Sequence, residues 1–388
     1  MNDKIVILDT TLRDGEQSAG VNFTLSDKLE IARALEAMRI DVIEAGFPAA
    51  SAAEFANVKA VAKEVRGAAI CALSRAVAED VDAAGEALKG AASPRIHIFL
   101  NASDMQLEHQ LRKKRDDVKA LAEAMIRRAR THVADVEFSA MDATRADPDF
   151  LAEIVRAAIA AGARTINLPD TVGYILPHQL HAMMVDLRAR VPELDAVCMS
   201  FHGQDDLGLS TANTLEAIRA GARQVELTVN GIGERAGNTA LEEVVVALAL
   251  HGPSLGVRVD VDTTKISALS QLVADRSGMP VAPNKALVGR NAFRHASGIH
   301  QNGVIKKRET FEWIDPKMVG NTRGTEIVLG KLSGRAGFLA RVRALGIEVT
   351  ASKEEETFAR FQALADRQRV VEDAEVRAIC LHGASASS

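Results

Sequence analysis

The feature that most constrains the fold is a regular alternation of two kinds of segment along most of the chain. Short apolar runs rich in β-branched residues predict strands, and a longer run with apolar residues at helical spacing follows each of them. The expected strands are residues 5–8, 41–44, 69–73, 96–100, 135–138, 165–168, 196–201 and 224–229. The expected helices are residues 26–38, 52–65, 77–88, 116–130, 147–161, 177–191, 211–222 and 240–251, the first with Ser26 as its N-cap.

Eight strands that alternate with eight helices predict a parallel sheet covered by helices. The number and size of the units fit a closed (β/α)8 barrel better than an open sheet, so we predict an α/β TIM barrel over residues 1–275. Residues 276–388 differ, because 278–303 predict loops and 354–369 a polar helix. We expect a small α-rich linker and lid domain there, which could serve as a dimerisation arm, and a disordered tail at 383–388.

Composition excludes several classes of partner. The 388 residues are 47% hydrophobic and 26% charged, as in an ordinary soluble globular protein. A net charge of −5 provides no global basic field, so we expect no nucleic-acid partner. No apolar run reaches membrane-spanning length, which predicts no membrane association and a cytoplasmic location. The three cysteines form no CxxC pair, which suits a reducing compartment and argues against a thiolate metal site.

Polar residues gather where a TIM barrel places its active site, at the C-terminal ends of the strands. Asp14, His202 and Asn238 follow the first, seventh and eighth expected strands and offer a carboxylate, an imidazole and an amide oxygen. Such a set suits Mg²⁺, Mn²⁺ or Zn²⁺ in a site with room for substrate. Any one of them alone would be read as a solvated loop residue, but together they favour a metal site. Further candidates for catalysis or substrate binding at these strand ends are Arg13, Gln17, Glu44, Asp142, Arg145 and Thr171.

Five motifs resemble the 2-isopropylmalate synthase and homocitrate synthase family over nearly the whole chain. They are LDTTLRDGEQ (8–17), IEAGFP (43–48), LPDTVGY (168–174), NGIGERAGN (230–238) and SGIHQ (297–301). The resemblance implies a metal-dependent TIM barrel that condenses acetyl-CoA with a 2-oxo acid. It also implies a homodimer, in which a C-terminal arm completes the site of a partner subunit. The segments at 46–48, 283–286 and 308–311 look more like isopropylmalate synthases than homocitrate synthases.

The same resemblance implies roles for individual residues. Asp14, His202 and Asn238 would be metal ligands, together with Gln204, which stands where the family's His-x-His motif has its second histidine. Arg13 would orient the 2-oxo acid, and His300 would be the catalytic histidine of the arm. Beyond what the resemblance implies, we expect Asp142 to assist His300 with protons, and Gln17, Glu44, Thr171 and Arg145 to contact the substrate.

Several departures from the family's motifs fall at site positions. Besides Gln204, they are Met141 in place of a glutamate, Ala296 in place of a glutamate, and Leu332 and Gln106 in place of histidines. Because an amide oxygen suits Mg²⁺ or Mn²⁺ better than Zn²⁺, we expect one of the first two. The departures leave three functions open: a synthase with an altered substrate, a related metal-dependent carbon–carbon lyase or aldolase, and a non-catalytic or regulatory paralogue.

Overall fold

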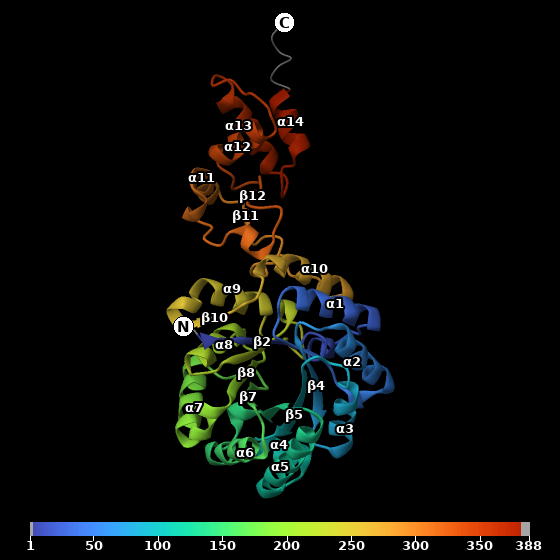
Figure 1. Cartoon of the computed structure of the whole chain (residues 1–388). Helices are drawn as coiled ribbons and strands as arrows, with labels where there is room; N and C mark the ends of the chain where they lie inside the picture. Colours follow the sequence, from blue (N-terminus) through green and yellow to red (C-terminus); the bar gives the residue numbers. More distant parts are fainter. Residues whose placement is uncertain (1–2, 382–388) are drawn as a thin grey trace. The chain divides into compact units, whose positions relative to one another are not determined.

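The computed structural model describes residues 3–381, which form two compact units, one reaching Val281 and the other starting at Ala282 (Figure 1). The first unit contains a closed barrel in which each strand pairs in parallel with its sequence neighbours and β9 pairs with β2. The prediction of a (β/α)8 barrel is therefore confirmed. The barrel strands are β2 (Val6–Asp9), β3 (Val42–Gly46), β4 (Ala69–Arg75), β5 (Pro94–Asn101), β6 (Asp135–Met141), β7 (Thr165–Asp170), β8 (Cys198–Gly203) and β9 (Gln224–Leu227).

Helices between the strands form an outer ring around the barrel (Figure 1). They are α1 (Leu25–Ala37), α2 (Ala52–Glu64), α3 (Ala78–Ala87), α5 (Arg115–His132), α6 (Pro148–Ala161), α7 (Pro177–Arg190), α8 (Ser210–Arg219) and α9 (Leu241–His251). The prediction of Ser26 as the first N-cap is wrong, because Thr24 caps α1. Its side chain accepts from the Asp27 N–H, and the Asp27 carboxylate accepts from the Thr24 N–H. Ser26 would have Leu29 at the reciprocal position, which cannot complete such a capping box.

Two elements of the first unit are not among the expected ones. A helix, α10 (Ile266–Ser277), follows the eighth repeat, and a short parallel pair joins β1 (Asp3–Lys4) to β10 (Val257–Arg258). Ile266, Leu269 and Val273 are buried along one face of α10, at the spacing that predicts a helix. The expected domain boundary at residue 275 lies within this helix.

The interior of the barrel holds charged groups among its apolar residues. Glu44, His97 and Glu137 are all buried on β3, β5 and β6. His97 Nδ1 lies 2.7 Å from Glu44 Oε1, and Arg95 Nη1 donates to Glu137 Oε2 at 3.0 Å. Pairing is needed here because an isolated buried charge costs several kcal/mol, of order 3 or more. The floor beneath the strand ends is therefore polar and tightly connected.

The second unit is α-rich, as expected, and has its own apolar core. It contains β11 (Arg294–His295), α11 (Gly298–Lys306), β12 (Glu326–Ile327), α12 (Arg335–Ala344), α13 (Glu354–Ala365) and α14 (Asp373–Leu381). Phe338 and Phe361 stack at 4.8 Å between ring centroids inside this core. Residues 278–303 are not loop throughout, because β11 and the start of α11 fall within them, and the polar helix ends at Ala365. The tail predicted at 383–388 lies outside the described residues.

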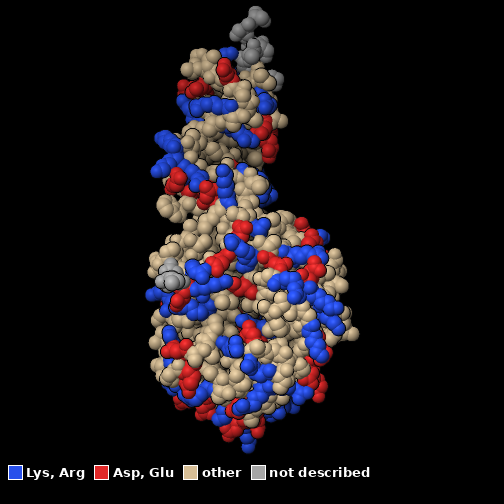
Figure 2. All heavy atoms as spheres, viewed as in Figure 1, with Lys and Arg blue, Asp and Glu red and all other residues tan. Residues whose placement is uncertain are grey.

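Surface charge on the barrel is mixed. Figure 2 shows Lys and Arg side chains interleaved with Asp and Glu side chains over the visible face of the first unit. Within residues 3–381, no helix is both long enough and apolar enough to cross a membrane.

Candidate active site

A cavity of about 250 Å³ lies at the strand ends of the barrel. One part of its wall is apolar and comes from four consecutive strands, with Leu73 on β4, Phe99 on β5, Met141 on β6 and Pro169 on β7. The other part comes mainly from β8, β9 and the loops after β2, β8 and β9. Its polar lining includes Arg13, Asp14, Gln17, His202, Gln204, Glu226, Glu234 and Arg235. A ligand in this cavity would meet an apolar wall and a polar wall at once.

Arg13 and Asp14 are held in place by the loop that follows β2. Arg13 Nη1 donates to Asp14 Oδ2 at 2.8 Å, and Arg13 Nε donates to Glu44 Oε2 at 2.7 Å. Thr10 Oγ1 also donates to Glu44 and accepts from the backbone N–H of Asp14. Burial alone would raise the pKa of Asp14, but the adjacent Arg13 guanidinium and His202 lower it below its usual range. Asp14 is therefore a carboxylate anion at neutral pH.

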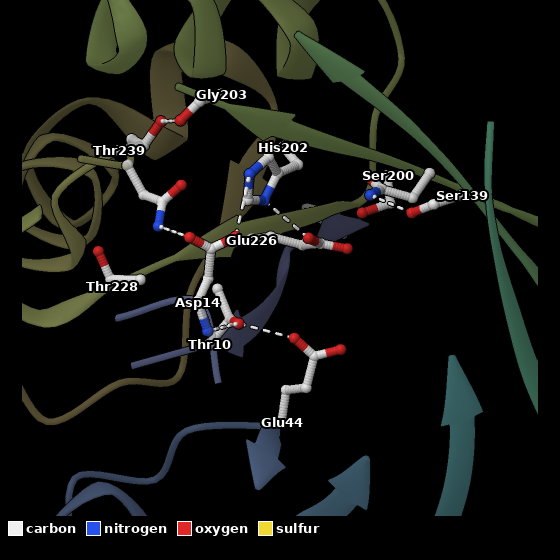
Figure 3. A network of polar contacts seen from close by, with 12 residues as sticks. Thr10, Asp14, Glu44, Ser139, Ser200, His202, Gly203, Glu226, Thr228 and Thr239 are labelled. Carbon is white, nitrogen blue, oxygen red and sulfur yellow. Dashed lines mark hydrogen bonds and ion pairs between the residues drawn. The ribbon is translucent and has the colours of Figure 1, made fainter. Parts of the chain in front are cut away.

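His202 lies between two carboxylates, as Figure 3 shows. Its Nδ1 is 2.9 Å from Glu226 Oε2, and its Nε2 is 3.9 Å from Asp14 Oδ2. When Nδ1 carries the proton and donates to Glu226, the lone pair of Nε2 faces Asp14, which is the arrangement of a metal-binding histidine. Burial lowers the pKa of His202, but the hydrogen bond and charge of Glu226 outweigh this and raise it above its ordinary value.

Gln204 and Asn238 complete this group. Their backbones form an isolated antiparallel bridge, which brings the loop after β8 against the loop after β9. Asn238 Nδ2 donates to Asp14 Oδ1 at 2.9 Å, and Gln204 Nε2 lies 3.2 Å from His202 Nε2. Asn238 Oδ1 and Gln204 Oε1 are buried acceptors without a hydrogen-bond partner among the described residues.

These two oxygens are available as ligands for a cation, because buried polar atoms in native proteins are almost always satisfied and these have no partner among the described residues. With the Asp14 carboxylate and the His202 imidazole, they make a four-residue donor set that fits a divalent metal. Three of the four donor atoms are oxygens.

Two other groups of potential ligand atoms lie deeper in the barrel. One is Glu44, Cys71 and His97, and the other is His97, Glu137 and Glu226, each with its atoms within 4.8 Å of one another. Burial raises the pKa of the Cys71 thiol well above its ordinary value, which favours the neutral thiol in the absence of a metal. Because His97 already pairs with Glu44, the first group is neutralised without an ion.

The remaining candidates from the barrel sequence separate into two sets. Gln17 and Thr171 line the cavity. Glu44, Asp142 and Arg145 do not belong to its lining: Glu44 lies behind Arg13, and Asp142 is buried in an ion pair with Arg145 at 2.7 Å. Asp142 has φ 66°, and its N–H donates to Thr171 Oγ1 at 2.9 Å. It therefore contacts a cavity residue through its backbone.

His300 belongs to the second unit, on α11. Its ring stacks on Phe311 with centroids 4.2 Å apart. Three large apolar side chains of this unit, Ile299, Trp313 and Leu332, are three-quarters exposed at 75%, 76% and 75%.

The sequence did not single out several residues that line the cavity from within the strands. They are His97, Ser139, Asn167 and Glu226. Each alternates along a buried strand with apolar residues that face the surrounding helices, so the inward positions of these strands are mostly polar, and this period-2 pattern was the available signal. A search limited to the residues that follow each strand does not find them.

Comparison with known proteins agrees with the motifs. The HMGL-like family model matches residues 4–273, and the homocitrate synthase post-HMGL domain-like model matches residues 287–369. The 2-isopropylmalate synthase of Pyrococcus abyssi is 51% identical over 97% of this chain and 77% of its own length. That of Synechocystis sp. is 49% identical over 97% of this chain and 73% of its own length.

Solved structures support the barrel fold. The Bacillus subtilis HMG-CoA lyase superposes with a TM-score of 0.62 at 20% identity, covering 75% of this chain and 97% of that one. The Pseudomonas aeruginosa hydroxymethylglutaryl-CoA lyase gives a TM-score of 0.62 at 20% identity, over 72% and 95% of the two chains. At this level of sequence identity, the structural similarity supports the fold alone. The matches along the whole sequence are to synthases, and the chain belongs to the 2-isopropylmalate synthase family of acyl-CoA:2-oxo acid condensing enzymes.

Proposed function

We propose that this chain is an acyltransferase of amino-acid biosynthesis that condenses acetyl-CoA with an apolar 2-oxo acid in the cytoplasm. One observation carries the proposal: Arg13, Asp14 and His202 line a cavity whose other wall is apolar, and Asn238 contacts Asp14 from behind this lining. A guanidinium is the preferred partner of a carboxylate, and the apolar wall suits the side chain of the same substrate. The polar and apolar walls would thus hold opposite ends of the 2-oxo acid.

A divalent metal would be held by Asp14, His202, Asn238 and Gln204. When bound there, it would polarise the ketone oxygen of the 2-oxo acid. We infer that Mg²⁺ or Mn²⁺ is preferred over Zn²⁺, because oxygen donors outnumber the single imidazole nitrogen.

The protein side chains supply positioning and proton transfer. Arg13, fixed by Glu44 and Asp14, orients the carboxylate of the 2-oxo acid. The methyl carbon of acetyl-CoA must lose a proton and form a bond to the ketone carbon, after which water cleaves the thioester and frees the CoA thiol. We assign proton transfer to His300. Asp142, tied to Arg145, would act by holding Thr171 at the cavity wall.

We further propose that the enzyme is a homodimer in which the partner subunit's His300 completes each site. The second unit, which carries His300, also exposes three large apolar side chains, those of Ile299, Trp313 and Leu332. They form an apolar surface that a second copy could cover. Mixing an Arg13→Ala chain with a His300→Ala chain should restore part of the activity that each lacks alone. Absence of any complementation would contradict the shared site.

The proposed activity is tested by following free thiol after mixing the protein with acetyl-CoA, Mn²⁺ or Mg²⁺ and a panel of 2-oxo acids. We expect thiol release with a branched apolar 2-oxo acid and none without it. Arg13→Ala should abolish the release, whereas Arg127→Ala, on the outer helix α5, should not. Metal and 2-oxo acid binding without thiol release under any condition would instead indicate a non-catalytic family member.

A further inference from the structure

The loop after β5 carries three consecutive cations without an acidic partner. The turn η3 (Leu107–Leu111) ends at Arg112, which has the left-handed φ of 54°, and Lys113 and Lys114 follow it. All three side chains are exposed, and within residues 3–381 none of them forms an ion pair. The next residue, Arg115, differs, because it pairs with Asp104 at 2.6 Å and with Asp147 at 3.2 Å.

The other cations at the C-terminal ends of the barrel strands are already paired. Their carboxylate partners lie at 2.6–2.8 Å, and the pairs are Arg13 with Glu44, Arg75 with Asp80, Arg145 with Asp142, and Arg235 with Asp206. Among the described residues at this end of the barrel, the loop after β5 therefore supplies arginine and lysine side chains that have no carboxylate partner.

The base of this loop is fixed against the cavity wall. Asn101, the last residue of β5, donates through Nδ2 to Gln106 Oε1 at 2.7 Å and to Gln110 Oε1 at 2.8 Å. The backbone N–H of Ala102 donates to the carbonyl of Met141 at 2.9 Å, and Met141 lines the cavity. The loop that carries the cations is therefore tied at its base to the apolar side of the cavity.

We propose that Arg112, Lys113 and Lys114 bind the phosphate groups of the acyl-CoA substrate. This inference rests on the proposed function. In an acyl-CoA the phosphates are separated from the thioester by the pantetheine arm, so a phosphate site belongs at the rim while the thioester reaches the cavity. Lys supplies a mobile point charge and Arg a planar fork, and both are common phosphate ligands.

The direct test measures binding of CoA to the Mn²⁺-loaded protein by calorimetry. In the variant Arg112→Gln/Lys113→Gln/Lys114→Gln, the Kd for CoA should rise about 10- to 100-fold, because charge-assisted contacts are lost. The Kd for Mn²⁺ and for the 2-oxo acid should stay unchanged. Added salt should weaken CoA binding to the wild type and have a smaller effect on the variant, because exposed charges are screened. Dephospho-CoA lacks one phosphate of CoA. The triple substitution should therefore weaken the binding of dephospho-CoA less than it weakens the binding of CoA.

A matched control removes exposed cations from the other end of the barrel. Lys63 lies in the last turn of α2 and Lys265 precedes α10, and Lys63→Gln/Lys265→Gln should leave the Kd for CoA unchanged. If the wild type binds CoA and the triple variant keeps the wild-type Kd, the inference is overturned while the proposed function stands. If the wild type neither binds CoA nor releases thiol from acetyl-CoA, the proposed function fails and the inference falls with it.

Discussion

Glu226 Oε2 lies 2.9 Å from His202 Nδ1, so a residue inside β9 determines which imidazole nitrogen faces Asp14. We predict that Glu226→Ala raises the Kd for Mn²⁺ roughly 10- to 100-fold, the usual effect of losing a carboxylate behind a ligating histidine. Glu226→Gln, which can still accept from Nδ1–H, should have a smaller effect. Calorimetric titration of each variant with Mn²⁺ measures this.

Glu234→Gln is the control for Glu226, since it removes another cavity-lining carboxylate that forms no hydrogen bond or ion pair with His202 within residues 3–381. It should bind Mn²⁺ as the wild type does. Equal Mn²⁺ affinities for Glu226→Ala and the wild type would show that this carboxylate does not position the imidazole.

Lys28 on α1 is a fully buried cation, at 0% exposure, that joins the segment after β2 to helix α2. Its Nζ lies 2.7 Å from Glu16 and 2.8 Å from Glu54, and it donates to the carbonyl of Leu12 at 3.2 Å. We predict that Lys28→Met lowers the free energy of unfolding by about 3 kcal/mol or more, because two carboxylates lose their shared counter-ion. Urea denaturation measures the change. Lys63→Met, at an exposed position, should change it by about 0.5 kcal/mol at most, and equal effects would refute the role given to Lys28.

Asp9 gives the protein a defined pH dependence of stability. Burial raises its pKa to about 7, against hydrogen bonds from Thr11 that lower it. Because the folded state binds this proton more tightly than the unfolded state, the stabilisation is full below an unfolded pKa of about 3.9 and is lost as pH rises through about 7. Between about pH 5 and pH 8, the wild type should therefore lose on the order of 3 kcal/mol relative to Asp9→Asn.

Urea unfolding of both proteins at the two pH values gives this difference directly. Asp116→Asn is a suitable control, since that side chain is 93% exposed and should show no comparable pH-dependent difference. A difference between Asp9→Asn and the wild type that does not change with pH would contradict the assignment.

The repeat of strands and helices was sufficient to predict the barrel, because buried parallel strands and amphipathic helices have distinct periods. Asp14, His202 and Asn238 could be predicted to meet because each follows a strand of the same barrel, and the structure brings them together. Glu226 could not be assigned a role in this way. Its partner is 24 residues away on another strand, and only the register of β8 with β9 sets them side by side.

The ion pairs of Glu44 and Asp142 could not be predicted from the sequence either. Glu44 lies within β3 and Asp142 directly follows β6, near the end of the barrel that holds catalytic groups, but the fold pairs them with Arg13 and Arg145. Whether a carboxylate faces a cavity or a guanidinium depends on side chains from other loops. Local spacing therefore identifies the ring of polar residues but not which of them are already paired.

Gln204 is the departure from the family's motif that bears most directly on the metal. Its Nε2 lies 3.2 Å from His202 Nε2, and its Oε1 is buried without a hydrogen-bond partner among the described residues. We therefore predict that Gln204→His strengthens Zn²⁺ binding about tenfold or more relative to Mn²⁺, because an imidazole nitrogen replaces an amide oxygen. Asp14→Ala should abolish binding of both ions. Titration of the purified variants with each ion, without any measurement of turnover, gives the selectivity. Gln106→His places a histidine in the loop after β5, outside the cavity lining, and should leave selectivity unchanged. Equal selectivity of Gln204→His and the wild type would mean that residue 204 does not face the metal.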